Sequence, residues 1–280
     1  MRIAFITDIH SNHVALEACM RRIEEDDIDG IAFLGDYVTD CPYPQKTMRI
    51  LTHIPEWYET WFIRGNREDY LLGHRYNTAE QWSYCSQSGS LLYTYEELRG
   101  SDLRFFEDMP IGMEIKPEGL PPISICHGSM QDNRLLFDYQ CPIIDEVLAE
   151  TNTQLTVCGH FHTPYTYRNG GKTIVNVGSC GLPEHGSTEA TILIAESDGG
   201  DWEFEHIFVP FDTERVIAEF DKSGLAKKAP VWSRCAIATL RTGTNRILPC
   251  VNRVRQLCLE TGKPFDAEEL WLQAAEEQGV

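Results

Sequence analysis

Carboxylate, imidazole and amide side chains follow five short apolar segments of this 280-residue chain. The apolar content and length of each segment predict a β-strand. Because strands of an open α/β sheet hold ligands beyond their carboxyl ends, we expect the side chains that follow them to meet at one site. The segments are 3–7, 31–34, 60–64, 123–126 and 155–158, and the side chains that follow them are Asp8, His10, Asp36, Asn66, His127, His160 and His162.

The set contains two aspartates, four histidines and one asparagine. Mixed nitrogen and oxygen ligands suit Mn, Fe, Zn or Co better than Ca or Mg. Seven side chains exceed the four ligands of a closed structural zinc site, and they fit two metal ions that share a carboxylate. For any single motif, an ordinary turn or a buried structural histidine is the simpler interpretation. The ordered set of five motifs favours a dinuclear metal site.

Helical patterns alternate with these strands and indicate the elements that position the site. Apolar residues recur at helical spacing from Leu16 to Ile23, directly after the first strand. Early strand–helix units followed by closely spaced strands predict an α/β fold in which a sheet sandwich is flanked by helices. Residues 69–110 are helical and aromatic in pattern, and we expect a helical excursion beside the site. Further strands are predicted at 172–177, 191–195 and 203–209.

Strand alternation stops at Phe211, and the rest of the chain has a helical pattern. We therefore predict a domain over 1–210 that carries the site and a helical C-terminal appendage over 211–280. Its large apolar residues need a partner surface, so we expect the appendage to cover the site. The predicted helices are 212–220, 231–240, 249–260 and 266–277.

Composition excludes several classes of protein. There are 24 Lys and Arg against 43 Asp and Glu, and the resulting charge of −19 would repel a nucleic acid polymer or an anionic membrane. The ten cysteines include no C-x-x-C pair, so neither a zinc ribbon nor a redox dithiol is indicated. No segment approaches the roughly 20 apolar residues of a membrane helix. We expect a cytoplasmic protein.

The order of the motifs resembles that of the calcineurin-like metallophosphoesterase superfamily. The text around them, including GDYVTDCPYP and VNVGSCG, resembles the small bacterial branch that acts on phosphodiesters and nucleotides. This resemblance implies an α/β (α+β) fold, a four-layer α/β/β/α sandwich. The motifs are Asp8-x-His10, Gly35-Asp36, Gly65-Asn66, His127 and Gly159-His160-x-His162.

The resemblance also implies roles for these residues. Asp36 would bridge the two metals, and a metal-bridging hydroxide would attack phosphorus directly. The residues expected to take part in the chemistry are Asp36, Asn66, Arg67 and His127. The implied ligands are Asp8, His10, Asp36 and His162 for one metal, and Asp36, Asn66, His127 and His160 for the other.

One residue departs from the family pattern. A histidine commonly follows the Gly-Asn pair, whereas this chain has Arg67, followed by Glu68. Arginine cannot donate a proton at neutral pH, but its planar fork can hold phosphate oxygens. We therefore expect Arg67 to clamp the substrate, with a surface ion pair as the alternative. Arg134 and His185 are further candidates for substrate binding.

These expectations define an enzyme that hydrolyses a small phosphorylated substrate. Nucleotide phosphoanhydrides of the dinucleoside polyphosphate type are favoured over simple phosphodiesters, because a site without a general acid suits leaving groups that need no proton. A protein serine/threonine phosphatase of the same superfamily and a non-catalytic, nucleotide-sensing metal-binding scaffold are the alternatives. The oligomeric state stays open, and a homo-oligomer is among the possibilities.

Overall fold

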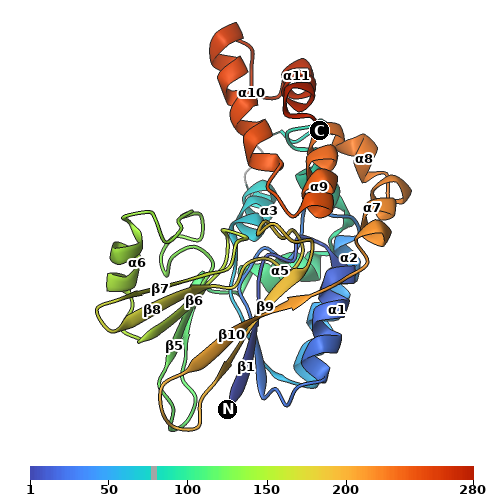
Figure 1. Cartoon of the computed structure of the whole chain (residues 1–280). Helices are drawn as coiled ribbons and strands as arrows, with labels where there is room; N and C mark the ends of the chain where they lie inside the picture. The colour runs from blue at the N-terminus through green and yellow to red at the C-terminus, as the bar shows by residue number, and fades with distance from the viewer. Residues whose placement is uncertain (77–80) are drawn as a thin grey trace.

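Two five-stranded sheets form the centre of the computed structural model, which describes residues 1–76 and 81–280 (Figure 1). Parallel pairing joins β1, β2 and β3 in one sheet and β5, β6 and β8 in the other, so several carboxyl ends lie along one edge of each sheet. The first sheet has the order β10 (Glu203–Val209), β9 (Ala190–Glu196), β1 (Arg2–Ile6), β2 (Gly30–Phe33) and β3 (Glu59–Phe62). The second has the order β4 (Gly112–Ile115), β5 (Ile123–Cys126), β6 (Leu155–Cys158), β8 (Lys172–Asn176) and β7 (Tyr165–Asn169).

Helices connect the strands and continue after the last one. Those before β10 are α1 (His13–Glu24), α2 (Pro44–His53), the 3-10 turn η1 (Ile54–Glu56), α3 (Asn66–Tyr76), α4 (Gly89–Glu97), α5 (Gly100–Glu107) and α6 (Ile144–Glu150). Those after β10 are α7 (Thr213–Lys222), α8 (Leu225–Lys228), α9 (Pro230–Thr242), α10 (Ile247–Thr261) and α11 (Glu268–Gln278).

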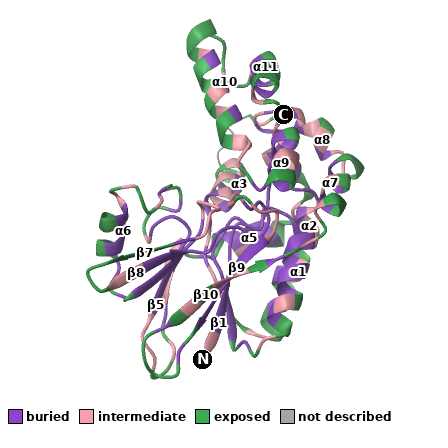
Figure 2. Ribbon diagram, in the orientation of Figure 1, coloured by how far each residue is buried: buried purple, intermediate pink, exposed green. Residues whose placement is uncertain are grey.

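The two sheets pack face to face through buried apolar side chains. Phe5 and Leu34 from the first sheet share one core with Ile125 and Val157 from the second. Helices α1, α2 and α5 cover the outer face of the first sheet, and α6 covers the second. The strands between these layers are largely buried (Figure 2). The predicted four-layer sandwich is therefore confirmed.

The predicted strands are present, and two edge strands were not predicted. β4 and β7 pair antiparallel at the outer positions of the second sheet. Most of their residues are half-buried or exposed, so neither has the continuous apolar run of a central strand. Such edge strands form because they pair with a neighbouring strand, here β5 or β8, and the local sequence does not specify this pairing.

The predicted first helix shows how local sequence places the site. The Asn12 side chain accepts a hydrogen bond from the Ala15 backbone N–H and so caps α1. Leu16, Cys19 and Ile23 are buried along one face of this helix against the first sheet. The turn between β1 and α1 is thereby held at the sheet edge where the polar side chains lie.

The C-terminal helices pack on the helices of the first layer. Phe220 of α7 and Leu240 of α9 share a buried core with Val14 of α1 and Tyr93 of α4. In Figure 1 these helices gather at the end of the molecule opposite the N-terminus. All four helices predicted after Phe211 are present, and the short α8 is an addition. The domain boundary at residue 210 stays a prediction.

The predicted excursion at 69–110 contains most of α3 and all of α4 and α5, while residues 77–80 within it lie outside the described part of the chain. Across the ranges 1–76 and 81–280, no helix is both long enough and apolar enough to cross a bilayer.

Candidate metal centre

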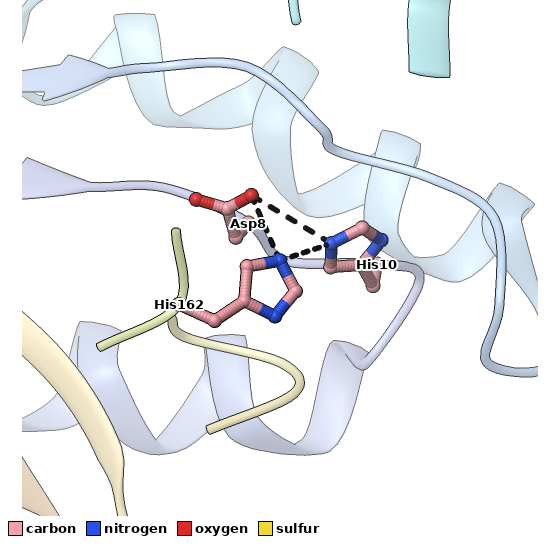
Figure 3. Close-up of side chains that lie close together, drawn as sticks. All are labelled: Asp8, His10 and His162. Carbon is pink, nitrogen blue, oxygen red and sulfur yellow. Dashed lines mark hydrogen bonds and ion pairs between the residues drawn. The ribbon is translucent and has the colours of Figure 1, made fainter. Parts of the chain in front are cut away.

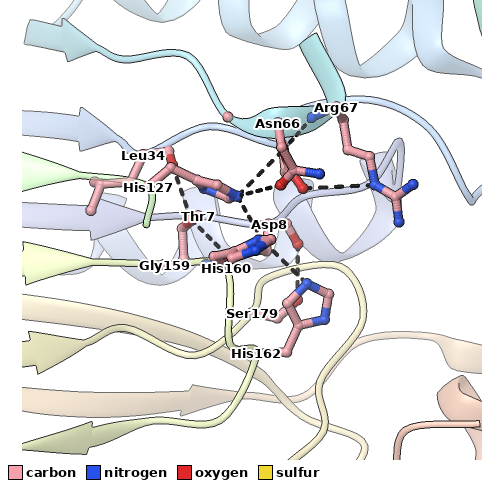
Figure 4. Close-up of polar contacts among 12 residues, drawn as sticks. Thr7, Asp8, Leu34, Asn66, Arg67, His127, Gly159, His160, His162 and Ser179 are labelled. Carbon is pink, nitrogen blue, oxygen red and sulfur yellow. Dashed lines mark hydrogen bonds and ion pairs between the residues drawn. The ribbon is translucent and has the colours of Figure 1, made fainter. Parts of the chain in front are cut away.

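The seven side chains predicted to share a site lie together at the carboxyl ends of the strands. Figure 4 labels Asp8, Asn66, His127, His160 and His162 among them. Backbone hydrogen bonds join the loops that carry them. The Asp8 N–H donates to Gly35 O at 3.1 Å, and the His10 N–H donates to Asp36 O at 3.0 Å. Within the second sheet, the Gly159 N–H donates to His127 O at 3.0 Å. The ligand positions are therefore fixed by main-chain contacts as well as by side chains.

The first cluster consists of Asp8, His10 and His162 (Figure 3). The Nε2 atoms of His10 and His162 are 3.0 Å apart. Oδ1 of Asp8 lies 3.1 Å from Nε2 of His162 and 3.7 Å from Nε2 of His10. These three atoms converge on one point, which is the arrangement that a metal ion requires.

The second cluster consists of Asp36, His127 and His160, with Asn66 beside it. Nε2 of His127 lies 3.4 Å from Oδ1 of Asp36 and 3.2 Å from Oδ1 of Asn66. The other carboxylate oxygen of Asp36, Oδ2, lies 3.9 Å from Nε2 of His10 in the first cluster. Asp36 therefore faces both clusters, as a bridging ligand would.

Polar contacts on the far side of three imidazole rings direct Nε2 toward the clusters. Nδ1 of His127 lies 2.7 Å from Leu34 O, and Nδ1 of His162 lies 2.9 Å from Leu182 O. Both carbonyls can only accept, so each Nδ1 carries the proton. Nδ1 of His10 lies 3.0 Å from Oδ2 of Asp40. Such outer contacts fix the tautomer and orientation of metal-binding histidines.

The buried carboxylates of the two clusters need compensating positive charge. Burial alone would raise the pKa of Asp36, but the positive charge of His127 lowers it to about 2. Burial would lower the pKa of His127, yet Asp36 and Asp8 raise it to about 9. Oδ1 of Asp8 is buried and accepts no hydrogen bond within the described part of the chain. Two metal ions would supply the positive charge that protonated imidazole otherwise provides, so the residues present fit them.

The ligands lie in strained backbone conformations. Five of these residues have φ between 48° and 68°, in the left-handed region that residues other than glycine seldom adopt. They are Asp8, His10, Asp36, His160 and His162. Each such residue costs of order 1–3 kcal/mol and persists only where the surroundings enforce it. Strain concentrated on ligand positions is typical of a functional site.

Glu68 and Asp40 are supporting residues that the sequence did not identify. The buried Glu68 carboxylate accepts hydrogen bonds from the backbone N–H groups of Asp36, Tyr37 and Gly65, all at 2.9–3.0 Å. It thereby joins the loops after β2 and β3. In the sequence, the feature that could have identified Glu68 is its position directly after Gly65-Asn66-Arg67. Only the folded chain shows that the Glu68 side chain turns inward.

Asp40 connects the first cluster to the C-terminal helices. Besides His10, its carboxylate contacts Nη2 of Arg67 at 3.0 Å and accepts a hydrogen bond of 2.8 Å from Nε1 of Trp232 on α9. Arg67 lowers the pKa of Asp40 against the opposing effect of burial. Asp40 therefore stays ionised and holds His10, Arg67 and Trp232 in one contact group.

The three predicted substrate contacts have different positions. Arg67 faces the metal centre and pairs with Asp40, which differs from the alternative of a surface ion pair with its sequence neighbours. Arg134 is exposed, lines the cavity and lies over the ring of Tyr70. His185 is outside the cavity lining, because its ring packs on Phe208 and its Nε2 lies 3.0 Å from Glu189 O. This position does not support the predicted substrate contact for His185.

A cavity of about 960 Å³ opens from the two clusters. Its lining includes His10, Asp36 and His160 at the metal centre, together with Trp232 of α9 and Val251 of α10. The site and the C-terminal helices therefore share one cavity.

Comparisons with known proteins agree with this geometry. The model of a family described as the calcineurin-like phosphoesterase superfamily domain matches residues 1–200. An uncharacterized protein of Methanocaldococcus jannaschii is 25% identical over 248 residues, which cover 82% of this chain and 94% of that protein. The UDP-2,3-diacylglucosamine hydrolase of a Shewanella species is 25% identical over 255 residues, covering 76% of this chain and 99% of the relative.

Two solved structures share the fold. A metallophosphoesterase from Sphaerobacter thermophilus has a TM-score of 0.68 and 23% identity, covering 87% of this chain and all of that one. A hypothetical protein from Pyrococcus horikoshii has a TM-score of 0.73 and 19% identity, covering 86% of this chain and 98% of the other.

We predict that Asp36 is the ligand on which metal content depends most. Asp36→Asn removes charge from between two cations, so we expect the purified variant to retain at most half of the Mn²⁺ that the wild type binds. Asn66→Ala removes a neutral ligand from one cluster and should lose less. Metal analysis after equilibrium dialysis measures both, and equal Mn²⁺ content in Asp36→Asn and wild type would contradict a bridging role.

We also predict that Asp40 positions His10. Asp40→Asn should weaken Mn²⁺ binding about 10- to 100-fold, the range found for residues that orient metal ligands. Trp232→Phe keeps an aromatic side chain but removes the N–H donor to Asp40, so its effect should be smaller and in the same direction. Calorimetric titration with Mn²⁺ measures the affinities. Unchanged affinity in a folded Asp40→Asn variant would mean that His10 is oriented without it.

Proposed function

Because the chain belongs to the calcineurin-like phosphoesterase superfamily, we propose that it hydrolyses a phosphoanhydride or phosphodiester bond of a small nucleotide. The chain is a metallophosphoesterase, and the substrate is the part that we infer. The observation that carries the proposal is the pair of His/Asp clusters at one end of a cavity that also contains the Arg67 guanidinium.

The proposed roles follow from the positions of the side chains. Asp36 would be shared between the two metals. Bound metals would lower the pKa of a water molecule and neutralise charge on the phosphoryl oxygens. The remaining ligands would be Asp8, His10 and His162 on one side and Asn66, His127 and His160 on the other.

Arg67 would hold the phosphoryl group from the side of the cavity. Its Nε lies 3.8 Å from Oδ2 of Asp36, and its guanidinium lies over the ring of Trp232. Burial would lower the pKa of Arg67, but Asp40 and Asp36 raise it, so the side chain remains a cation. A permanent cation can bind negative charge that develops on the phosphoryl oxygens, but it cannot protonate a leaving group.

This limitation supports a nucleotide anhydride as the substrate. Leaving groups that depart as stable anions, such as a nucleoside phosphate, need no proton, whereas an alkoxide does. The relative in Shewanella is named as a hydrolase of a UDP-linked compound, which is in line with a nucleotide phosphoanhydride. Dinucleoside polyphosphates contain phosphoanhydride bonds of the same chemical type.

A small substrate is favoured over a phosphoprotein. Side chains of α9, α10 and α11 line the same cavity as the metal clusters, so a folded protein would have to displace them to reach the site. The alternative of a non-catalytic scaffold is disfavoured by the full ligand set, because a scaffold has no need for two clusters that share a carboxylate.

A phosphate-release assay on the whole protein tests the proposal. The substrates are nucleotides, dinucleoside polyphosphates, cyclic nucleotides, an aryl phosphodiester and phosphopeptides, each with Mn²⁺, Co²⁺, Zn²⁺, Fe²⁺ or Mg²⁺. We expect the highest kcat/KM for a nucleotide anhydride and loss of turnover after chelation. Preference for phosphopeptides, or no turnover in a protein that has bound two metal equivalents, would contradict the proposal.

We predict that Arg67 sets the preference for leaving groups. Arg67→Ala should slow all substrates by about 100- to 1,000-fold, the effect of removing one donor to a developing oxyanion. Arg67→His can supply a proton near neutral pH, so the ratio of activity on an alkyl phosphoester to activity on the nucleotide anhydride should rise above the wild-type ratio.

Arg67→Lys is the matched control because it keeps the charge but loses the planar fork. Its activity should fall while the substrate ratio stays at the wild-type value. An unchanged ratio in Arg67→His would remove the residue-level support for an anhydride substrate.

A further inference from the structure

We propose that the part of the cavity beneath the C-terminal helices binds a long alkyl or acyl chain carried by the substrate, an inference that rests on the proposed hydrolase function. We call this part the helical chamber. Its apolar wall is formed by Trp82 and Leu91 from the helical excursion and by Trp232, Leu248, Val251 and Phe265 from the C-terminal region. A wall of this composition binds ligands through burial of carbon surface.

Helix α10 is apolar on two faces, one of them buried and the other only partly covered by protein. Cys250, Val254 and Leu257 are buried in a core shared with α9 and α11. Leu248 and Val251 lie one turn apart on another face, where both line the cavity. Leu248 keeps 41% of its surface exposed. A ligand chain would bury this second face and remove its apolar surface from water.

Three polar side chains of the chamber wall, those of Trp232, Trp271 and Asn245, are engaged with the protein itself. Nε1 of Trp232 donates to Asp40 at 2.8 Å, and Nε1 of Trp271 donates to Phe265 O at 2.7 Å. Asn245 donates to Glu184 and accepts from the backbone N–H of Leu248. The two indoles have no further N–H to offer a nucleobase, and the amide is left with one N–H and one lone pair. A chain needs no hydrogen-bond partner, so it suits this wall better than a base.

Arg67 marks the junction between the metal centre and the chamber. Its guanidinium carbon lies 5.6 Å from the centre of the Trp232 ring, and its Nε lies 3.8 Å from Asp36. A phosphoryl group held at the clusters and Arg67 would therefore direct an attached chain across Trp232 toward Val251. The nucleotide half of the substrate would lie on the side of the cavity lined by Phe161 and Thr163.

Calorimetric titration of the Mn²⁺-loaded protein with methyl-, butyl- and octylphosphonate tests the chamber without requiring turnover, because the C–P bond is not a phosphoester. Each buried methylene should tighten binding about fourfold, the factor that corresponds to about 0.8 kcal/mol. We expect octylphosphonate to bind at least 100-fold more tightly than methylphosphonate. Equal affinity across the series would overturn the proposal.

Variants on one helix locate the effect. Val251→Asp should reduce the advantage of octyl- over methylphosphonate at least tenfold, and Leu248→Asp, at a partly exposed position, provides the same test if Val251→Asp does not fold. Leu259→Asp is the matched control because Leu259 lies on α10 with 88% of its surface exposed. An octyl advantage that is equal in all three variants and the wild type would mean that the chain binds elsewhere, which also overturns the proposal.

A nucleotide titration separates the two possible occupants. UMP should bind with the same affinity to wild type and Val251→Asp, whereas loss of UMP binding with unchanged octylphosphonate binding would assign the chamber to a base and overturn the proposal. The phosphate-release assay is independent of these titrations. Chain-dependent binding without turnover of any phosphoester would reject the proposed function and leave the chamber supported.

Discussion

Two buried carboxylates, Asp8 and Asp36, impose the main electrostatic constraint on this molecule. Both are almost fully removed from solvent and face the same group of imidazoles. Buried negative charge is stable only beside compensating positive charge. The protein alone can provide it by protonating His127, whose pKa rises to about 9, but metal ions provide more charge in the same space. The surrounding loops are arranged to keep this charge compensation in place.

Main-chain contacts hold the loops against their own strain. Five ligand residues have left-handed backbones, and each would relax if its loop were free. Two glycines permit the close approach that prevents this relaxation. A Cβ atom at Gly65 would collide with Asp36, and one at Gly159 would collide with Thr7. Glu68 adds a buried carboxylate that holds three backbone N–H groups of the neighbouring loops. Packing energy of the two sheets thus maintains geometry that the ligands would not adopt alone.

The grouping of the seven side chains in the two clusters could be predicted from the sequence because their signal is local. Each ligand follows a strand directly, and strand direction places it at the sheet edge. Asp40 and Glu68 carry no such signal, since an acidic residue in a loop or in the first turn of a helix is normally solvated and the inward orientation of both depends on tertiary contacts. His185 differs from the ligand positions: it lies near a motif in sequence, but its ring packs on Phe208 of β10 and is outside the cavity lining. Proximity along the chain predicts placement only when the intervening backbone is fixed.

The candidate metal centre and the far wall of its cavity come from different parts of this chain. The family match ends at residue 200 and contains the seven side chains of the two clusters. Trp232, Val251 and Trp271 lie beyond it, yet they line the same cavity. The hydrogen bond from Trp232 to Asp40 joins the two parts, because Asp40 also contacts His10 and Arg67. A change in how α9 packs would therefore alter both the cavity wall and the orientation of a metal ligand, so the C-terminal helices can affect turnover without supplying a ligand to the metal centre.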